Sequence, residues 1–131
     1  MPSGRILQLM SQMTPIELDR IARVVHEAVR AWARANDQNA SRSWSQCAKW
    51  MREATYESVR FVLEHPDAPA SAQHDQWMEK KRRDGWTHGA EKSGVSKTHP
   101  MLVPYDELPL VERRKDELVR CLVAALSARL D

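Results

Sequence analysis

The sequence predicts an all-α fold, a compact bundle of about four helices with a long ordered loop between the third and the fourth. Apolar residues recur at intervals of three and four, helix-start signals precede these segments, and no stretch alternates apolar and polar residues as a strand does. A length of 131 residues with a hydrophobic content of 42% suits one domain with a modest core.

The first helix is expected to begin near Pro15. Thr14 can cap it, Pro15 suits the first helical position, and Glu17 can complete a capping box. Its apolar stripe consists of Leu18, Ile21, Val25, Ala28, Val29 and Trp32. The helix should end within ARANDQNASRS, where Asn, Asp and Ser compete for backbone hydrogen bonds.

A second helix is expected over about residues 44–64, packed against the first. Ser43 followed by Gln46 repeats the capping pattern. The apolar stripe of this helix consists of Cys47, Met51, Ala54, Ser58, Phe61 and Val62.

A third helix should follow the breaker HPDAPASA, with Ser71 as its cap. It should run to Arg83 and end at the glycine of Asp84-Gly85. Because Trp77 and Met78 are nearly its only apolar residues, the helix must dock through these two and leave a polar face free.

The segment from Gly85 to Pro109 contains three glycines and three prolines and shows no sustained period, so we expect an ordered loop. No strand is predicted; Met101 to Val103 is at best a short extended piece. The last helix, about residues 110–130, ends in LVRCLVAAL, where only Arg120 interrupts the apolar run. Such a helix lies at the centre of a fold or at a subunit interface.

Composition and charge exclude several classes of protein. The 20 Lys and Arg against 18 Asp and Glu give a formal charge of +2, which argues against general nucleic-acid binding. The chain has no apolar run long enough for a membrane span, and MPSGRILQLMSQM is unlike a signal peptide, so we expect a cytoplasmic protein. Cys47 and Cys121 form no CxxC pair and are expected to be reduced core thiols.

The familiar reactive motifs fail on spacing. Gly89 and Gly94 flank four residues as in a P-loop, but Val95 occupies the lysine position. None of the five histidines pairs with another at helical spacing, so no metal site is predicted. No GxSxG elbow is present. The sequence predicts neither a cofactor nor a catalytic residue.

The tryptophans leave two interpretations open. Trp77 lies on a polar helix with His74 one turn before it and Lys81 one turn after it, which suits a base-stacking surface beside a phosphate partner. Alternatively, Trp77 only anchors the helix to the core. Trp44, Trp50 and Trp86 are predicted to be core residues, whereas Trp32 could cap a groove.

Three motifs, HDQW, DGWTHG and KTHPMLVPYDELP, resemble the repeat of ryanodine receptors. The agreement covers about residues 66–130 at fixed spacing, and the whole chain resembles small stand-alone bacterial and phage members, with a helix pair before the repeat. The chain departs from the pattern at His88, where a Tyr is usual, and at Met101. The expected organisation is one domain over residues 1–131, with a flexible segment 1–13, a helix pair 14–65 and the repeat 66–131.

The resemblance implies a helical fold without catalytic activity. In the receptors, adenine nucleotides and drug-like compounds are held in a cleft where two H-x-x-W tryptophans face each other. The matching ligand-facing residues here are His74, Trp77, Lys81 and Lys92, with His99 and Asp116 close by. The resemblance implies that Trp77 stacks on a base, that the two lysines neutralise phosphate, and that the two histidines donate hydrogen bonds. A second tryptophan would come from Trp32 or from a second subunit in a homodimer.

These observations lead to a working hypothesis of a non-enzymatic module. It would bind an adenine-containing or cyclic signalling nucleotide as a sensor or sponge in bacterial or phage conflict. A protein-interaction module that uses the same surface is the alternative. An enzyme acting on a nucleotide is the third possibility, but no residue spacing demands it.

Overall fold

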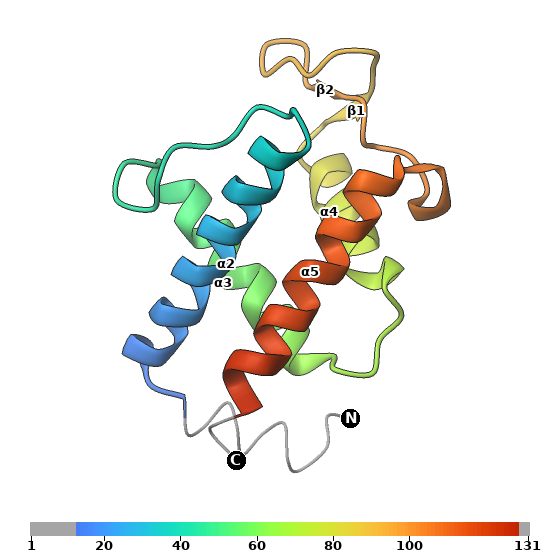
Figure 1. The fold of residues 1–131 in the computed structure, drawn as a ribbon. Coiled ribbons are helices and arrows are strands. Elements are labelled where there is room, and N and C mark those ends of the chain that lie inside the picture. Colours follow the sequence, from blue (N-terminus) through green and yellow to red (C-terminus); the bar gives the residue numbers. More distant parts are fainter. Residues whose placement is uncertain (1–12, 129–131) are drawn as a thin grey trace. The chain divides into compact units, whose positions relative to one another are not determined.

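The computed structural model describes residues 13–128 and is mostly helical, as predicted (Figure 1). Four α-helices are described: α2 (Pro15–Ala35), α3 (Lys49–Glu64), α4 (Ser71–Arg83) and α5 (Leu110–Ser127). Between α4 and α5 lie two short strands, β1 (Thr87–His88) and β2 (Thr98–His99), and the 3-10 turn η1 (Tyr105–Glu107). Except for Met13, the segment predicted to be flexible lies outside the described residues, as do the last residues of the expected C-terminal helix.

The chain divides into two compact units, each described by itself. The first unit combines the chain up to Asp67 with the part from Glu117 onward, and the second runs from Ala68 to Asp116. The boundary falls within α5, whose residues 110–116 belong to the second unit and whose later residues belong to the first. No helix within residues 13–128 is long and apolar enough to cross a membrane.

The start of α2 confirms the predicted capping box. The Glu17 amide donates to Thr14 Oγ1 at 3.1 Å, and the Thr14 amide donates to Glu17 Oε2 at 3.2 Å. Pro15 occupies the first helical position, where its missing N–H costs nothing. The helix ends at Ala35, inside the predicted stretch, and the side-chain amide of the C-cap residue Asn36 donates to the Trp32 carbonyl at 2.9 Å.

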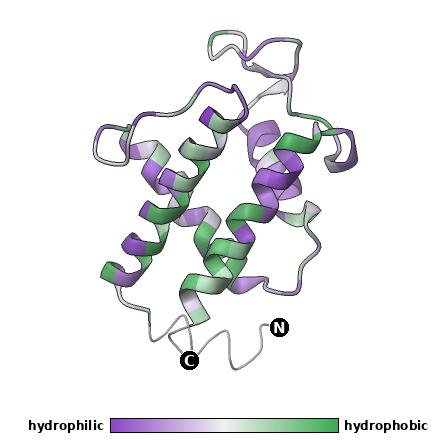
Figure 2. Cartoon of the chain, in the orientation of Figure 1, coloured by the Kyte–Doolittle hydropathy of each residue, from purple (hydrophilic) through white to green (hydrophobic). Residues whose placement is uncertain are grey.

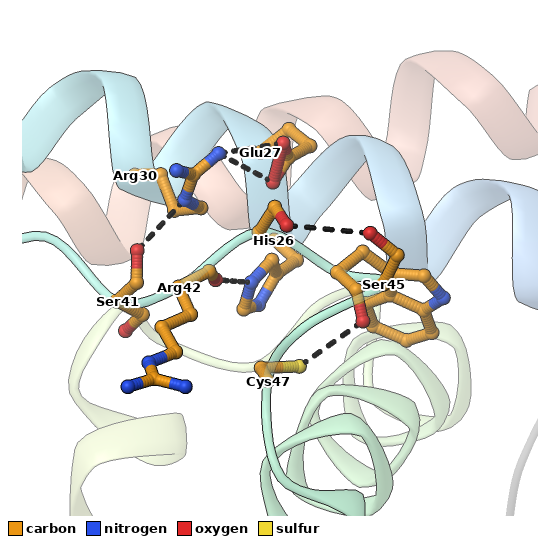
Figure 3. A network of polar contacts seen from close by, with 9 residues as sticks. His26, Glu27, Arg30, Ser41, Arg42, Ser45 and Cys47 are labelled. Carbon is orange, nitrogen blue, oxygen red and sulfur yellow. Dashed lines mark hydrogen bonds and ion pairs between the residues drawn. The ribbon is translucent and has the colours of Figure 1, made fainter.

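The segment after α2 is held by side chains of α2 (Figure 3). His26 Nε2 donates to the Arg42 carbonyl at 2.8 Å, and Arg30 Nε donates to the Ser41 carbonyl at 2.8 Å. Arg30 also forms an ion pair with Glu27. These bonds satisfy backbone carbonyls that have no partner in a ladder and fix the path of the chain.

The predicted start of the second helix is wrong. Ser43 caps no helix, because its carbonyl accepts from the amides of Gln46 and Cys47 and so closes a separate turn. This turn places Trp44 in the core, and α3 begins only at Lys49, without a side-chain cap. Capping residues also favour turns of this kind, so the pattern alone does not distinguish the two outcomes.

The core of the first unit is formed by α2, α3, the Trp44 turn and the later part of α5. Trp44 lies edge-on to His26 at 5.5 Å and to Tyr56 at 5.6 Å, measured between ring centroids. The Tyr56 hydroxyl donates to the Asp19 carboxylate, which lowers the pKa of Asp19 and raises that of Tyr56. The buried members of the cluster are Ile21, Ala22, Val25, Trp44, Val59, Val62, Leu63, Val119 and Val123.

Three residues predicted to face the core, Trp50, Ala54 and Cys121, are exposed, and helical geometry gives the reason. Trp50 is 62% exposed because it lies nine residues from buried Val59, which is about half a turn around α3. Cys121 is exposed because it lies between buried Val119 and Val123 on the opposite side of α5. Cys47, in contrast, is buried as predicted, and both thiols are free.

The second unit contains α4, the long loop, η1 and the start of α5. Ser71 is the first residue of α4 rather than its cap, but the helix ends at Arg83 before Gly85, as predicted. Figure 2 shows α4 as largely hydrophilic and the later part of α5 as largely hydrophobic. The buried side chains of this unit are His74, Met78, Leu102 and Leu108.

The loop contains a small parallel pairing that the sequence did not predict. β1 and β2 pair with Thr87 opposite Thr98 and His88 opposite His99. The Thr87 amide donates to the Lys97 carbonyl at 2.9 Å. Strands of two residues are too short to show an alternating pattern, so sequence periodicity could not have revealed them.

Candidate functional site

Five rings of the second unit form a continuous row, here called the ring row: Tyr105, His74, Trp77, His99 and Trp86. His74 and Trp77 are stacked, with centroids 5.5 Å apart and planes 23° apart. His99 meets Trp77 edge-on at 4.9 Å and lies 6.4 Å from Trp86. Tyr105 approaches the other end, 6.2 Å from His74. Residues from α4, the loop and η1 thus converge on one site.

His74 is held as a structural member of the row. It is buried, and its Nε2 donates to the Val103 carbonyl at 2.8 Å. The expected hydrogen bond to a ligand would therefore have to come from the other ring nitrogen. The H-x-x-W spacing stacks this fixed imidazole on Trp77, so His74 sets the orientation of the indole.

Trp77 is only partly buried, although its helix has few other apolar residues. Its neighbour Met78 is buried and provides the main anchor of α4. The indole contacts the loop through His99 and keeps exposed surface, a geometry that is compatible with either interpretation of Trp77.

His99 is oriented by the backbone of its own loop. Its Nδ1 accepts a hydrogen bond from the Met101 amide at 3.0 Å, so in the neutral ring the proton is on Nε2. Burial lowers the pKa of His99, and the charges of Lys92 and Lys81 lower it further. The ring is therefore a neutral hydrogen-bond donor at pH 7.

Lys81 lies on Trp86, not beside Trp77 as its spacing suggested. Its Nζ is 4.3 Å from the centroid of the Trp86 ring, within cation–π range. Burial lowers the pKa of Lys81, and Lys92 lowers it further. Trp86, predicted to be a core residue, is only partly buried and lies outside the core cluster.

Lys92 brings a second cation to the site. It lies in the exposed loop between β1 and β2, close enough for its charge to lower the pKa of both Lys81 and His99. Neither lysine has an ion-pair partner within the described part of the chain. Asp84 is the carboxylate that acts on Lys81, and Lys97 donates to the Asp84 carbonyl at 2.8 Å. The result is a local excess of positive charge.

Asp116 lies on α5, near the His74 end of the ring row. Burial raises its pKa to about 6, against the opposing effect of the Lys115 and His74 charges. Glu112 raises this pKa further, although Glu112 itself pairs with Lys115 at 2.5 Å. A carboxyl group with such a pKa is often found at a functional site.

The structure thus brings six of the seven expected residues into the second unit: His74, Trp77, Lys81, Lys92, His99 and Asp116. The seventh, Trp32, is half-buried on α2 in the first unit. Sequence reasoning missed Trp86 and Tyr105 as members of the site. The contact of Lys81 with Trp86 follows from the way α4 ends, which is a signal present in the sequence.

Within residues 13–128, no group of three or more His, Cys, Asp or Glu side chains is arranged to hold a metal ion. No curated protein is significantly similar to the chain. The profile of one family, described as RyR domain, matches residues 60–127. Because this match spans more than half of the 131 residues and contains all three motifs, the chain belongs to the RyR domain family.

Proposed function

We propose that the chain is a non-enzymatic module that binds a nucleotide, adenine-containing or cyclic, through the ring row and its two lysines. It would serve as a sensor or sponge for a signalling nucleotide in a bacterial or phage setting. The observation that carries the proposal is the position of Trp77 against His99, whose ring is in turn within reach of the charges of Lys81 and Lys92. An aromatic surface beside unpaired cations suits a base with its phosphate.

The roles can be assigned from the geometry. A base would stack on the exposed part of Trp77, which His74 holds from one side. Phosphate oxygens would meet the two ammonium groups and accept a hydrogen bond from His99 Nε2. His74 supports the site, because its Nε2 is already bonded to the loop.

The expected affinity is micromolar at best. One stacked base contributes about 1–3 kcal/mol, and each charged hydrogen bond adds about 1.5–3 kcal/mol. Association opposes these contributions with a cost of at least about 4 kcal/mol. Two or three charged contacts and one stack therefore leave roughly 8 kcal/mol at best, which corresponds to about 1 μM.

Calorimetric titration of the full chain with mono-, di- and cyclic nucleotides tests the proposal. We expect binding that Trp77→Ala abolishes and that Trp50→Ala leaves unchanged, because Trp50 is an exposed indole of the first unit. Thermal melts of both variants establish that they are folded. The proposal fails if folded wild-type protein binds no nucleotide of the panel.

Two further readouts separate the other hypotheses. Chromatography of the nucleotides after incubation would reveal products if the chain were an enzyme. If Trp77→Ala disrupts capture of a partner protein while nucleotides do not compete, the surface serves protein interaction instead.

The proposal includes a homodimer, in which a second copy would supply another stacking ring. The exposed surface that Trp77 keeps within one copy supports this part of the proposal. Sedimentation with and without the bound nucleotide measures the oligomeric state directly. A monomer in the nucleotide-bound form would exclude the second copy.

A further inference from the structure

The contact of Lys81 with Trp86 is built into the end of α4. The Gly85 amide donates to the Arg82 carbonyl at 3.0 Å, and the Trp86 amide donates to the Lys81 carbonyl at 2.9 Å. With Gly85 at a φ of +89°, these two bonds form a Schellman motif. In this motif the second residue beyond the cap packs against the last turn of the helix. Here Trp86 is the second residue beyond the cap, and Lys81 is the residue of the last turn against which it packs.

The cap consequently determines where the Lys81 ammonium group lies. A lysine on a helix surface samples many rotamers, but here Nζ is held 4.3 Å from the Trp86 ring centroid. The π face attracts the charged form of the side chain, which opposes the loss of hydration caused by burial. Lys81 is thus an oriented cation before any ligand arrives.

The surroundings of Lys81 favour an anion at this end of the ring row. The groups that act on His99 are Lys92, Lys81, Glu112 and Lys115, and the carboxylate among them is already paired with Lys115. The Trp86 ring lies 6.4 Å from His99 and carries Lys81 Nζ over its face, so it extends the ring row toward Lys81. Asp84 offsets part of the charge of Lys81, and Lys92 adds a second positive charge beside it.

We infer that Trp86 is a positioning residue of the binding site, whose ring holds the Lys81 ammonium group ready to meet a phosphate. The inference rests on the proposed function and deepens it, because it assigns the phosphate end of the ligand to Trp86 and the base end to Trp77. A cation that is already oriented loses less rotamer freedom on binding, which strengthens the contact. Trp86 acts through Lys81.

The test uses the full chain and sodium pyrophosphate, a probe with no base to stack. Trp86→Leu and Trp86→Met remove the π face, whereas Trp86→Phe keeps it, and all three keep the backbone amide of the helix cap. Trp50→Leu is the matched control, since it removes an exposed indole in the first unit. Titrations are made at constant ionic strength because phosphate contacts depend on salt.

Two measurements are expected to agree. In proton NMR, the Lys81 ε-methylene signals, assigned by their absence in Lys81→Arg, should be shifted upfield in the wild type and Trp86→Phe and not in the other two Trp86 variants. The dissociation constant for pyrophosphate should rise about threefold to tenfold in Trp86→Leu and Trp86→Met, the range expected for a partly desolvated cation–π contact. Trp86→Phe and Trp50→Leu should stay within about twofold of the wild type.

The inference is overturned if the non-aromatic variants bind pyrophosphate as the wild type does, if Trp86→Phe loses as much affinity as they do, or if pyrophosphate does not bind. Should neither non-aromatic variant fold, the wild type decides, because bound pyrophosphate must displace the Lys81 ε-methylene signals. A titration with ADP separates the two proposals. If ADP binding depends on Trp77 but not on Trp86, only this inference fails. If pyrophosphate binding depends on Trp86 but ADP does not bind, only the nucleotide function fails.

Discussion

Replacing Asp116 with asparagine should stabilise the protein at neutral pH. Burial raises the pKa of this carboxyl group to about 6 from its ordinary value of 3.8. At a pH between these two pKa values, Asp116 keeps its proton in the folded state and releases it in the unfolded state. The free energy of unfolding therefore falls as the pH rises from about 4 to about 6, and this contribution stays lost at higher pH.

The size of the effect follows from the same two pKa values. At about 1.4 kcal/mol per pKa unit, the difference corresponds to about 3 kcal/mol, which is the cost of keeping Asp116 ionised in the fold at pH 7. Asparagine has the same shape and no charge, but burying its amide without a good partner costs about 1 kcal/mol. Because the amide cost does not depend on pH, we expect Asp116→Asn to raise the free energy of unfolding by about 2 kcal/mol at pH 7 and to lower it by up to about 1 kcal/mol at pH 4.

Urea denaturation of both proteins at one-unit steps from pH 4 to pH 8 measures this difference. The other carboxyl groups titrate in both proteins, so subtracting the two curves isolates Asp116. The difference, variant minus wild type, should rise between pH 4 and pH 6 and then stay nearly constant. Parallel curves over the whole range, or a variant less stable than the wild type at pH 7, would show that Asp116 carries no burial cost. If the stabilised variant binds nucleotide more weakly than the wild type, Asp116 contributes to binding although its burial destabilises the fold.

Three substitutions test the packing within the two units, one in the second unit and two in the first. In Gly89→Ala, the new Cβ would lie 2.6 Å from Thr98 Cβ, so β1 and β2 must separate. The melting temperature of the protein and the NMR chemical shifts of β2 should both change. Unchanged chemical shifts of β2 would contradict this close approach. In the first unit, Trp44→Ala should cost about 3–5 kcal/mol because the ring is buried, whereas Trp50→Ala should cost less than about 0.5 kcal/mol. Urea denaturation measures both, and equal losses would refute the assignment of the two tryptophans.

The parts of the fold that the sequence predicts are those set by local chemistry. The start of α2 follows from Thr14 and Glu17, whose bonds span three residues, and the end of α4 follows from a glycine that reaches a positive φ without strain. The helical stripe of α2 likewise places Ile21 and Val25 in the core. These signals need no knowledge of the rest of the chain.

Two of the failed predictions depend on contacts that are not local in the sequence, and the third overlooked the geometry of a helix. Ser43 has the side chain of a helix cap, but Arg30 and His26 hold the preceding segment so that a turn forms first. The pairing of β1 with β2 depends on backbone bonds between residues about ten apart, and two-residue strands have no period of their own. Trp50 was assigned to the core as a large apolar residue, although its position on α3 is opposite to that of Val59.

For the candidate site, the resemblance named six residues that lie in the second unit, but it did not predict their contacts. Lys81 is one helical turn from Trp77, which suggested a shared ligand-facing surface, yet its ammonium group lies on Trp86. The reason is the helix end: Gly85 closes a Schellman motif, in which the next residue frequently packs on the last turn, as Trp86 does here. Reading DGW as a helix cap with a packing partner, and not only as a loop with a core tryptophan, would have placed Trp86 at the site. The same cap therefore ends α4 and orients the cation on which the proposed phosphate contact depends.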